Sequence, residues 1–97
     1  MKPSEALQLH RAAIRQIVAR HAATNPRVFG SVLHGDDGED SDLDLLVDPV
    51  AGRTTLVSLV RIKREVETLL GVRTDVLTPM ALHERCRSVV LSEAVPL

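Results

Sequence analysis

The chain has 97 residues, of which 44% are hydrophobic, and 12 Lys and Arg residues stand against 13 Asp and Glu residues. A chain of this length supports one small hydrophobic core, so we expect a single domain over residues 1–97. The balanced charge and the single aromatic residue, Phe29, argue against nucleic-acid binding, which draws on basic surfaces and stacking rings.

Cys86 is the only cysteine, which excludes a disulfide framework and a cysteine zinc cluster, and we expect it to pack as a small, partly buried apolar residue. The four histidines show no paired ligand spacing, which also argues against zinc. No segment approaches the roughly 20 apolar residues of a membrane span, and residues 1–5 lack the apolar core of a signal peptide. A reducing cytoplasm is therefore the expected compartment.

The first part of the chain is predicted to hold a helix, a strand and a loop. The helix begins at Ser4, a good capping residue, and ends at Asn25-Pro26. Residues 27–30 form a short strand, followed by a short helix through His34 and a polar loop over 35–41. The residues expected on the buried face of the first helix are Leu7, Ile14, Ile17 and Val18.

The second part is predicted to alternate strands and helices. Its elements are a strand over 43–48 closed by Pro49, a helix that begins after Thr54 or Thr55 and ends at Gly71, a strand over 72–78, and a last helix from Pro79 into 89–91. The residues expected on the inward face of the middle helix are Leu56, Leu59, Val60, Val66 and Leu70. This order indicates an α/β fold in which helices cover a small mixed β-sheet.

Asp42 and Asp44 are the most informative residues of the chain. Side chains two apart on a strand share a face, so these carboxylates lie roughly 6.5 Å apart on one face, while Leu43, Leu45 and Val47 point to the core. In a partly desolvated site the two charges repel each other, and a bound cation offsets that repulsion. Magnesium is the leading candidate, because it takes one or two carboxylates and completes its shell with waters and phosphate oxygens.

Gly30 and Ser31 end the preceding strand. A glycine permits close backbone approach and Ser31 offers a hydroxyl and an amide, which together suit a phosphate; an ordinary strand-ending turn is the alternative. The spacing to Asp42 favours the phosphate site. A P-loop is excluded, because Asp36-Asp37 stand where Lys and Ser or Thr are required. The acidic residues of the loop, Asp36, Asp37, Glu39 and Asp40, are expected to be solvated.

Two further residues are candidates for the same site. Asp75 carries a charge inside an apolar strand, so it is either a third metal ligand, a base that takes a proton from an attacking hydroxyl, or an edge-strand charge that faces water. His34 lies in the candidate phosphate loop, where it either donates to a phosphate oxygen or is an ordinary surface histidine.

Two segments separated by five loop residues resemble the signature of minimal nucleotidyltransferase (MNT) domain proteins, which belong to the polymerase-beta-like superfamily. These segments are Gly30-Ser31-Val32-Leu33-His34-Gly35 and Ser41-Asp42-Leu43-Asp44-Leu45-Leu46-Val47. The resemblance extends over most of the chain, including Asp75 where the family carries its third carboxylate. It implies a nucleotidyltransferase fold, with Gly30, Ser31, Ser41 and His34 holding the nucleotide and Asp42, Asp44 and Asp75 binding Mg²⁺.

The resemblance also implies a reaction and a partner. MNT proteins often act as antitoxins of a HEPN-domain ribonuclease, so the implied reaction transfers AMP from ATP to a hydroxyl, that of a tyrosine of this toxin. Two alternatives are an antitoxin that neutralises the toxin by binding alone and a nucleotidyltransferase for a small molecule. The chain departs from the family pattern at Leu33-His34, where a small residue followed by Arg or Lys is usual.

Overall fold

A computed structural model describes residues 1–97, and its first elements follow the predicted order. The elements are α1 (Pro3–Arg20), β1 (Ala23–Phe29), α2 (Ser31–His34), β2 (Leu43–Pro49), α3 (Leu56–Leu70), β3 (Thr74–Leu77), the 3₁₀ helix η1 (Pro79–Ala81), α4 (Glu84–Glu93) and β4 (Val95–Pro96).

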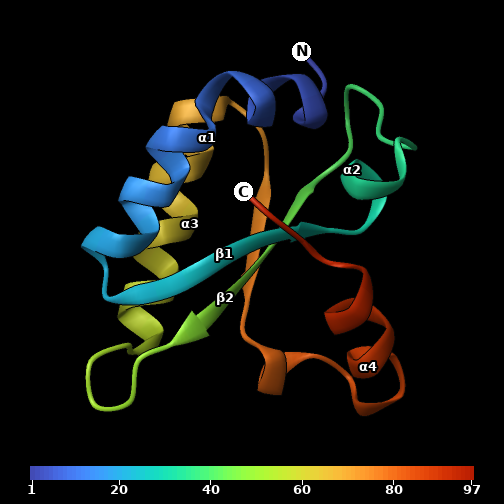
Figure 1. Ribbon diagram of the computed structural model, residues 1–97. Helices are drawn as coiled ribbons and strands as arrows, with labels where there is room; N and C mark the ends of the chain where they lie inside the picture. Colours follow the sequence, from blue (N-terminus) through green and yellow to red (C-terminus); the bar gives the residue numbers. More distant parts are fainter.

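The four strands form one sheet in the order β3-β2-β1-β4. Strand β2 runs parallel to β3 and antiparallel to β1, so the sheet is mixed and the predicted α/β fold class is confirmed. Figure 1 shows α1 and α3 side by side against the sheet, with α4 on the other side of the crossing strands β1 and β2.

The core lies between the sheet and the helix pair α1 and α3. All four residues predicted for the buried face of α1 are buried, and Leu43, Leu45 and Val47 of β2 meet them from the sheet. The predicted alternation along β2 is therefore confirmed. Leu46, on the opposite face, is also fully buried. The face that carries Asp42 and Asp44 is thus covered at one end and open at the other.

The predicted end of the first helix was wrong. Helix α1 begins at Pro3, so Ser4 is not its cap, and it ends at Arg20, while Asn25-Pro26 lies inside β1. The pairing register of β1 with β2 shifts between Thr24 and Arg27, and Asn25 adopts a positive φ of 52°. Asparagine tolerates this conformation and proline has no N–H to donate, so the pair forms a bulge rather than a helix end.

The acidic loop is not fully solvated, contrary to expectation. Asp37 is only 7% exposed, and its Oδ2 accepts a hydrogen bond of 2.9 Å from the Ser4 backbone N–H. This N–H belongs to the first turn of α1 and has no partner within the helix. Burial alone would raise the pKa of Asp37, but the hydrogen bonds from Ser4 outweigh it and the pKa is lowered. A loop carboxylate therefore caps α1.

Helix α3 confirms the predicted caps but not the whole predicted face. Thr55 accepts a hydrogen bond from the Ser58 N–H, and Gly71 ends the helix with a φ of 68°. The buried residues are Ile62 and Val66, with Leu59 and Leu70 partly buried, whereas Leu56 and Val60 are 81% and 46% exposed. Leu56 and Val60 lie about 120° and about 160° around the helix from Ile62, so they fall outside the buried face.

The chain after β3 is more broken than predicted. A 3₁₀ helix covers Pro79–Ala81, the chain extends at the buried Leu82, and α4 begins only at Glu84, after His83 accepts a hydrogen bond from the Arg85 N–H. No element was predicted beyond residue 91, but the end of the chain contains β4, which pairs with β1. Cys86 is exposed on α4, so the expectation of a partly buried cysteine was wrong.

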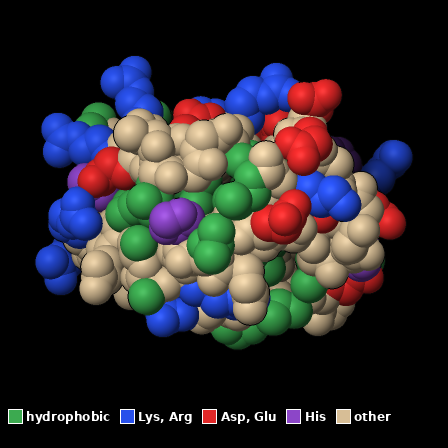
Figure 2. Space-filling model, turned by 90° about the horizontal axis from the view of Figure 1, so that it is seen from above, with side chains coloured by type: hydrophobic (Ala, Val, Ile, Leu, Met, Phe, Trp, Pro, Cys, Tyr) green, Lys and Arg blue, Asp and Glu red, His purple; other side chains and the backbone are tan.

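The helices are too short or too polar for a membrane span. Seen from above, the molecule shows hydrophobic side chains in the middle of the face, with Lys and Arg side chains along the left rim and most of the Asp and Glu side chains toward the right (Figure 2). Lys and Arg side chains also lie beside the acidic ones on the right, so the two signs of charge are interspersed there.

Candidate active site

The parallel pairing of β2 and β3 brings the predicted carboxylates to one edge of the sheet. Asp44 is in register with Asp75 on β3 and with Phe29 on β1, and Asp42 stands two residues before Asp44. Neighbouring strands lie about 4.8 Å apart, so Asp75 is as near to Asp44 in the sheet as Asp42 is along the chain. Gly30 follows Phe29 directly, which places it beside Asp44.

Gly30 is in close contact with Asp44. Its φ of 78° lies in the left-handed region, and a Cβ added at Gly30 would lie 2.3 Å from Asp44 Oδ2. Glycine is therefore required twice, for its backbone conformation and for the space that the carboxylate fills. This contact fixes the end of β1 against the central carboxylate.

Asp44 is the carboxylate of the site whose ionised form is disfavoured. Its pKa is raised by burial first, and then by the charges of Asp75 and Asp42. Each of these causes disfavours the ionised form, and a cation nearby would reverse the effect. The arrangement thus favours a positively charged ligand at Asp44.

Asp42 faces Arg73, which precedes β3. The Arg73 Nε lies 3.1 Å from Asp42 Oδ1, yet this buried oxygen accepts no hydrogen bond, so the two groups are held together by charge without an aligned N–H. The Arg73 side chain is 78% exposed. An exposed and poorly aligned guanidinium is weakly held, and Asp42 Oδ1 remains open to a better partner.

Asp75 is exposed on the edge strand β3, and two side chains of α3 hold this edge in place. Glu67 Oε2 accepts a hydrogen bond of 3.0 Å from the Thr74 N–H, and Lys63 Nζ donates one of 3.0 Å to the Thr74 carbonyl. Lys63 Nζ also lies 3.8 Å from Glu67 and 3.9 Å from Asp75 Oδ1. Lys63 and Glu67 therefore occupy the place that a further strand would take.

The remaining predicted residues line the loop side of the site. Ser31 begins α2 directly after Gly30, as predicted. The Ser41 hydroxyl accepts a hydrogen bond of 2.8 Å from the Gly38 N–H, so it closes the loop turn. His34 is exposed, and its Nε2 lies 3.2 Å from Glu93 Oε2 at the end of α4. Of the predicted nucleotide contacts, Gly30 is the one in direct contact with a carboxylate of the site.

The carboxylates suit a hard cation, although they do not form a closed cage. No group of three His, Cys, Asp or Glu side chains is drawn together tightly enough to enclose a metal ion. Magnesium, however, is held by one or two carboxylates and otherwise by water and phosphate oxygens. Asp44, whose ionised form lacks a neutralising partner, and Asp42 Oδ1, which is buried without a hydrogen-bond donor, are carboxylate oxygens of this kind. The oxygen donors present therefore fit Mg²⁺ brought in with a phosphate ligand.

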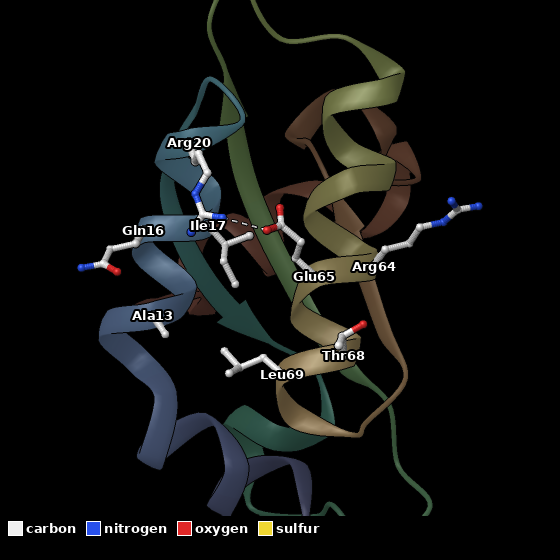
Figure 3. A pocket seen from close by; sticks show the side chains of 8 residues that line it. All are labelled: Ala13, Gln16, Ile17, Arg20, Arg64, Glu65, Thr68 and Leu69. Carbon is white, nitrogen blue, oxygen red and sulfur yellow. Dashed lines mark hydrogen bonds and ion pairs between the residues drawn. The ribbon is translucent and has the colours of Figure 1, made fainter.

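The molecule has three cavities, one of which, of about 260 Å³, is lined by Lys63 of α3 and Val76 of β3. The other two differ in how close they lie to this site. One of about 250 Å³ adjoins it, lined by Ser41 and Arg73, the neighbours of Asp42, and by Gly71. A larger one of about 450 Å³ lies between α1 and α3, where Arg20 of α1 reaches Glu65 of α3 at 2.9 Å (Figure 3). The larger cavity lacks the paired carboxylates, so size alone does not locate the chemistry.

Three residues near the carboxylates were not predicted from the sequence, namely Lys63, Glu67 and Arg73. Lys63 and Glu67 are four residues apart on α3, a spacing that signals a surface ion pair but not a contact with the edge of β3. Arg73 stands on the same face of the predicted strand as Asp75. Its contact with Asp42 follows from the parallel register, which the sequence pattern did not define.

Comparison with known proteins identifies the family. A model of the nucleotidyltransferase domain matches residues 11–96. The protein adenylyltransferase MntA of Thermococcus cleftensis is 33% identical over 89 residues, which cover 92% of this chain and 86% of the relative. The protein MJ0435 of Methanocaldococcus jannaschii, provisionally named a protein adenylyltransferase, is 38% identical over 79 residues, which cover 81% of this chain and 84% of the relative. The chain therefore belongs to the nucleotidyltransferase domain family.

Comparison with solved structures supports the same family. A protein described provisionally as a minimal nucleotidyltransferase has a TM-score of 0.85 and 48% identity, and the match covers 97% of this chain and 95% of that one. A toxin-antitoxin structure with AMP-PNP has a TM-score of 0.70 over 97% of this chain and 71% of that one, but at 12% identity it shows the fold alone. The resemblance to minimal nucleotidyltransferases is thus confirmed, and the chain is an enzyme of the nucleotidyltransferase class.

Proposed function

We propose that these 97 residues act as a single minimal nucleotidyltransferase domain, which transfers AMP from ATP to a hydroxyl of a partner toxin and thereby acts as its antitoxin. Relatives named as protein adenylyltransferases support a protein as the acceptor. A tyrosine of a HEPN-type ribonuclease is the acceptor that the MNT resemblance favours. The observation that carries the proposal is the alignment of Asp44 with Asp75 and Gly30, with the raised pKa of Asp44.

In this proposal the chain's residues divide the work between holding the nucleotide and activating the acceptor. Gly30 and Ser31, with Ser41 and His34 at the loop, hold the triphosphate. Because His34 Nε2 lies against Glu93, its contact with a phosphate requires that pair to open. Asp42, Asp44 and Asp75 hold Mg²⁺, which when bound supplies positive charge to neutralise the attacking and leaving oxygens.

In this proposal Asp75 acts on the acceptor hydroxyl. It is exposed on the edge strand, so a hydroxyl of another protein reaches it without crossing the domain. The acceptor oxygen forms a bond to the α-phosphorus of ATP, the bond from that phosphorus to the α,β-bridging oxygen breaks, and pyrophosphate leaves. The hydroxyl proton passes to the Asp75 carboxylate.

The proposal is tested by incubating the protein with ATP, Mg²⁺ and a HEPN-type ribonuclease toxin that it neutralises, and then measuring the intact mass of the toxin. We expect the toxin to gain the mass of AMP, and peptide fragmentation to place it on a tyrosine. An unmodified toxin would contradict the proposal. The same incubation with EDTA is the control for the metal.

An antitoxin that acts by contact alone is the second candidate, because Asp42 is paired with Arg73 and the three carboxylates do not enclose a cation. The double variant Asp42→Asn with Asp44→Asn separates the two functions. Loss of both AMP transfer and neutralisation supports transfer as the antitoxin activity. Full neutralisation by the double variant would instead favour contact.

A further inference from the structure

The candidate nucleotide site has little permanent positive charge on its loop side. Residues 30–35 contain no Lys or Arg, and their one basic side chain, His34, lies against Glu93. A triphosphate carries several negative charges, so a site that holds it gains from a guanidinium or an ammonium group. The ion pairs of the three carboxylates show where such groups are available.

Two cations lie within ion-pair distance of these carboxylates, and both come from the β3 side. Lys63 Nζ lies 3.9 Å from Asp75 but is engaged by the Thr74 carbonyl and by Glu67. Arg73 has a single acidic partner, Asp42, and its side chain is 78% exposed. Arg73 is therefore the cation that is free to move.

The contact between Arg73 and Asp42 has the form of a replaceable pair. Asp42 Oδ1 is buried and 3.1 Å from Arg73 Nε, but no hydrogen bond joins them. A buried carboxylate oxygen without a donor gains more from a directly bound cation than from a misaligned guanidinium. Arg73 also lines the cavity of about 250 Å³ beside Asp42, together with the loop acids Glu39 and Asp40, so its guanidinium is not packed in on that side.

We infer that Arg73 is a functional residue of the site with two alternating partners. Without metal, its guanidinium occupies the cation position at Asp42. When a metal ion takes Asp42 Oδ1, the guanidinium is released and binds a phosphate of the same nucleotide. Arg73 thus supplies from the β3 side the cation that Leu33-His34 does not supply from the loop. The inference rests on the proposed function, because it needs metal and nucleotide at these carboxylates.

Two calorimetric titrations of Arg73→Ala test this, and they should change in opposite directions. Mg²⁺ alone, titrated into nucleotide-free protein, should bind about two- to fivefold more tightly than to the wild type, because its competitor is gone. ATP, titrated at saturating Mg²⁺ without an acceptor, should bind about five- to tenfold more weakly, because a charge-assisted contact is lost.

Arg61→Ala is the matched control, since Arg61 is exposed on α3 and its loss changes the net charge equally. It should leave both titrations unchanged. Arg73→Lys, which keeps the charge but loses the planar fork, should restore most of the ATP affinity. If Arg73→Ala leaves either titration at the wild-type value, or if Arg61→Ala matches it, the inference is overturned. A wild type that binds no ATP with Mg²⁺ would instead overturn the proposed function, and this inference with it.

Discussion

At the scale of single residues, the site depends on how closely Gly30 approaches Asp44. The positive φ of Gly30 and the carboxylate beside it are separate constraints, since a Cβ at that position meets Asp44 Oδ2 at 2.3 Å. Gly35 has a similar φ of 73° but no atom within 4 Å of an added Cβ. The backbone angles differ in ψ, however: −152° at Gly30 is open to glycine alone, whereas 16° at Gly35 is the left-handed conformation that other residues also adopt. Gly35 therefore serves as a control for a glycine that has a positive φ but no contact with the carboxylate.

Gly30→Ala should abolish AMP transfer, because the new methyl group displaces the Asp44 carboxylate. Gly35→Ala should cost about 1 kcal/mol of stability for its left-handed backbone, less than the strain at Gly30, while activity measured below its unfolding temperature is kept. Steady-state transfer rates and thermal unfolding of both variants check this. Equal losses of activity in the two variants would refute a specific role for the contact.

Asp44 should reduce the stability of the metal-free fold. A group whose pKa is raised in the folded state stabilises it below the unfolded pKa, and this contribution is lost as the pH rises through the folded pKa. Asp44→Asn should therefore raise Tm at pH 7 by about 2–4 °C, corresponding to about 0.5 kcal/mol after solvent screening. The gain should disappear at pH 3, and transfer should be lost. A lower Tm at pH 7 would show that the repulsion is already relieved.

At the scale of elements, side chains from one element complete the hydrogen bonds of another. Asp37 of the loop caps α1 through the Ser4 N–H, and Glu67 and Lys63 of α3 close the edge of β3 at Thr74. These contacts tie the loop and the edge strand, which flank the carboxylates, to the two long helices. The site is thereby positioned by α1 and α3 although both helices lie on the opposite face of the sheet.

Asp37→Ala should lower stability by about 1 kcal/mol at pH 7, which is typical for loss of a helix cap. The pKa of Asp37 is lowered in the fold, so its contribution is present above the unfolded pKa and is lost as the pH falls through the folded pKa. The difference from wild type should therefore shrink below about pH 4. Urea unfolding at pH 7 and pH 3 measures it, with Asp36→Ala, an exposed neighbour, as the control.

Glu67→Ala should free the edge of β3. The Thr74 N–H loses its acceptor, which costs about 1 kcal/mol, and its amide should exchange with solvent much faster. Glu67→Gln keeps an acceptor oxygen and should retain most of the protection, so the pair separates the hydrogen bond from the charge. An unchanged exchange rate of the Thr74 amide in Glu67→Ala would show that the hydrogen bond to Glu67 does not stabilise the edge of β3.

At the scale of the whole molecule, the alternation of polar and apolar residues was sufficient to predict the fold class and the face of Asp42 and Asp44. Both features follow from local patterns, namely the two-residue period of the strand and the apolar face of α1. The bulge at Asn25-Pro26 and the capping role of Asp37 depend on partners far apart in the chain, and local signals misplaced them. The break before α4 is local, since His83 accepts a hydrogen bond from the Arg85 N–H, but the sequence pattern did not predict it. The contacts of Arg73 and Lys63 were missed for the same reason, since strand register is a tertiary property.

The central claim is that Asp42 and Asp44 hold a metal ion that in turn binds the phosphates of ATP. Calorimetric titration of ATP into the wild-type protein, with Mg²⁺ and then with EDTA, tests it most directly. We predict saturable binding with Mg²⁺ that is lost both in EDTA and in the Asp42→Asn, Asp44→Asn double variant. Equal binding with and without Mg²⁺, or undiminished binding by the double variant, would contradict the claim.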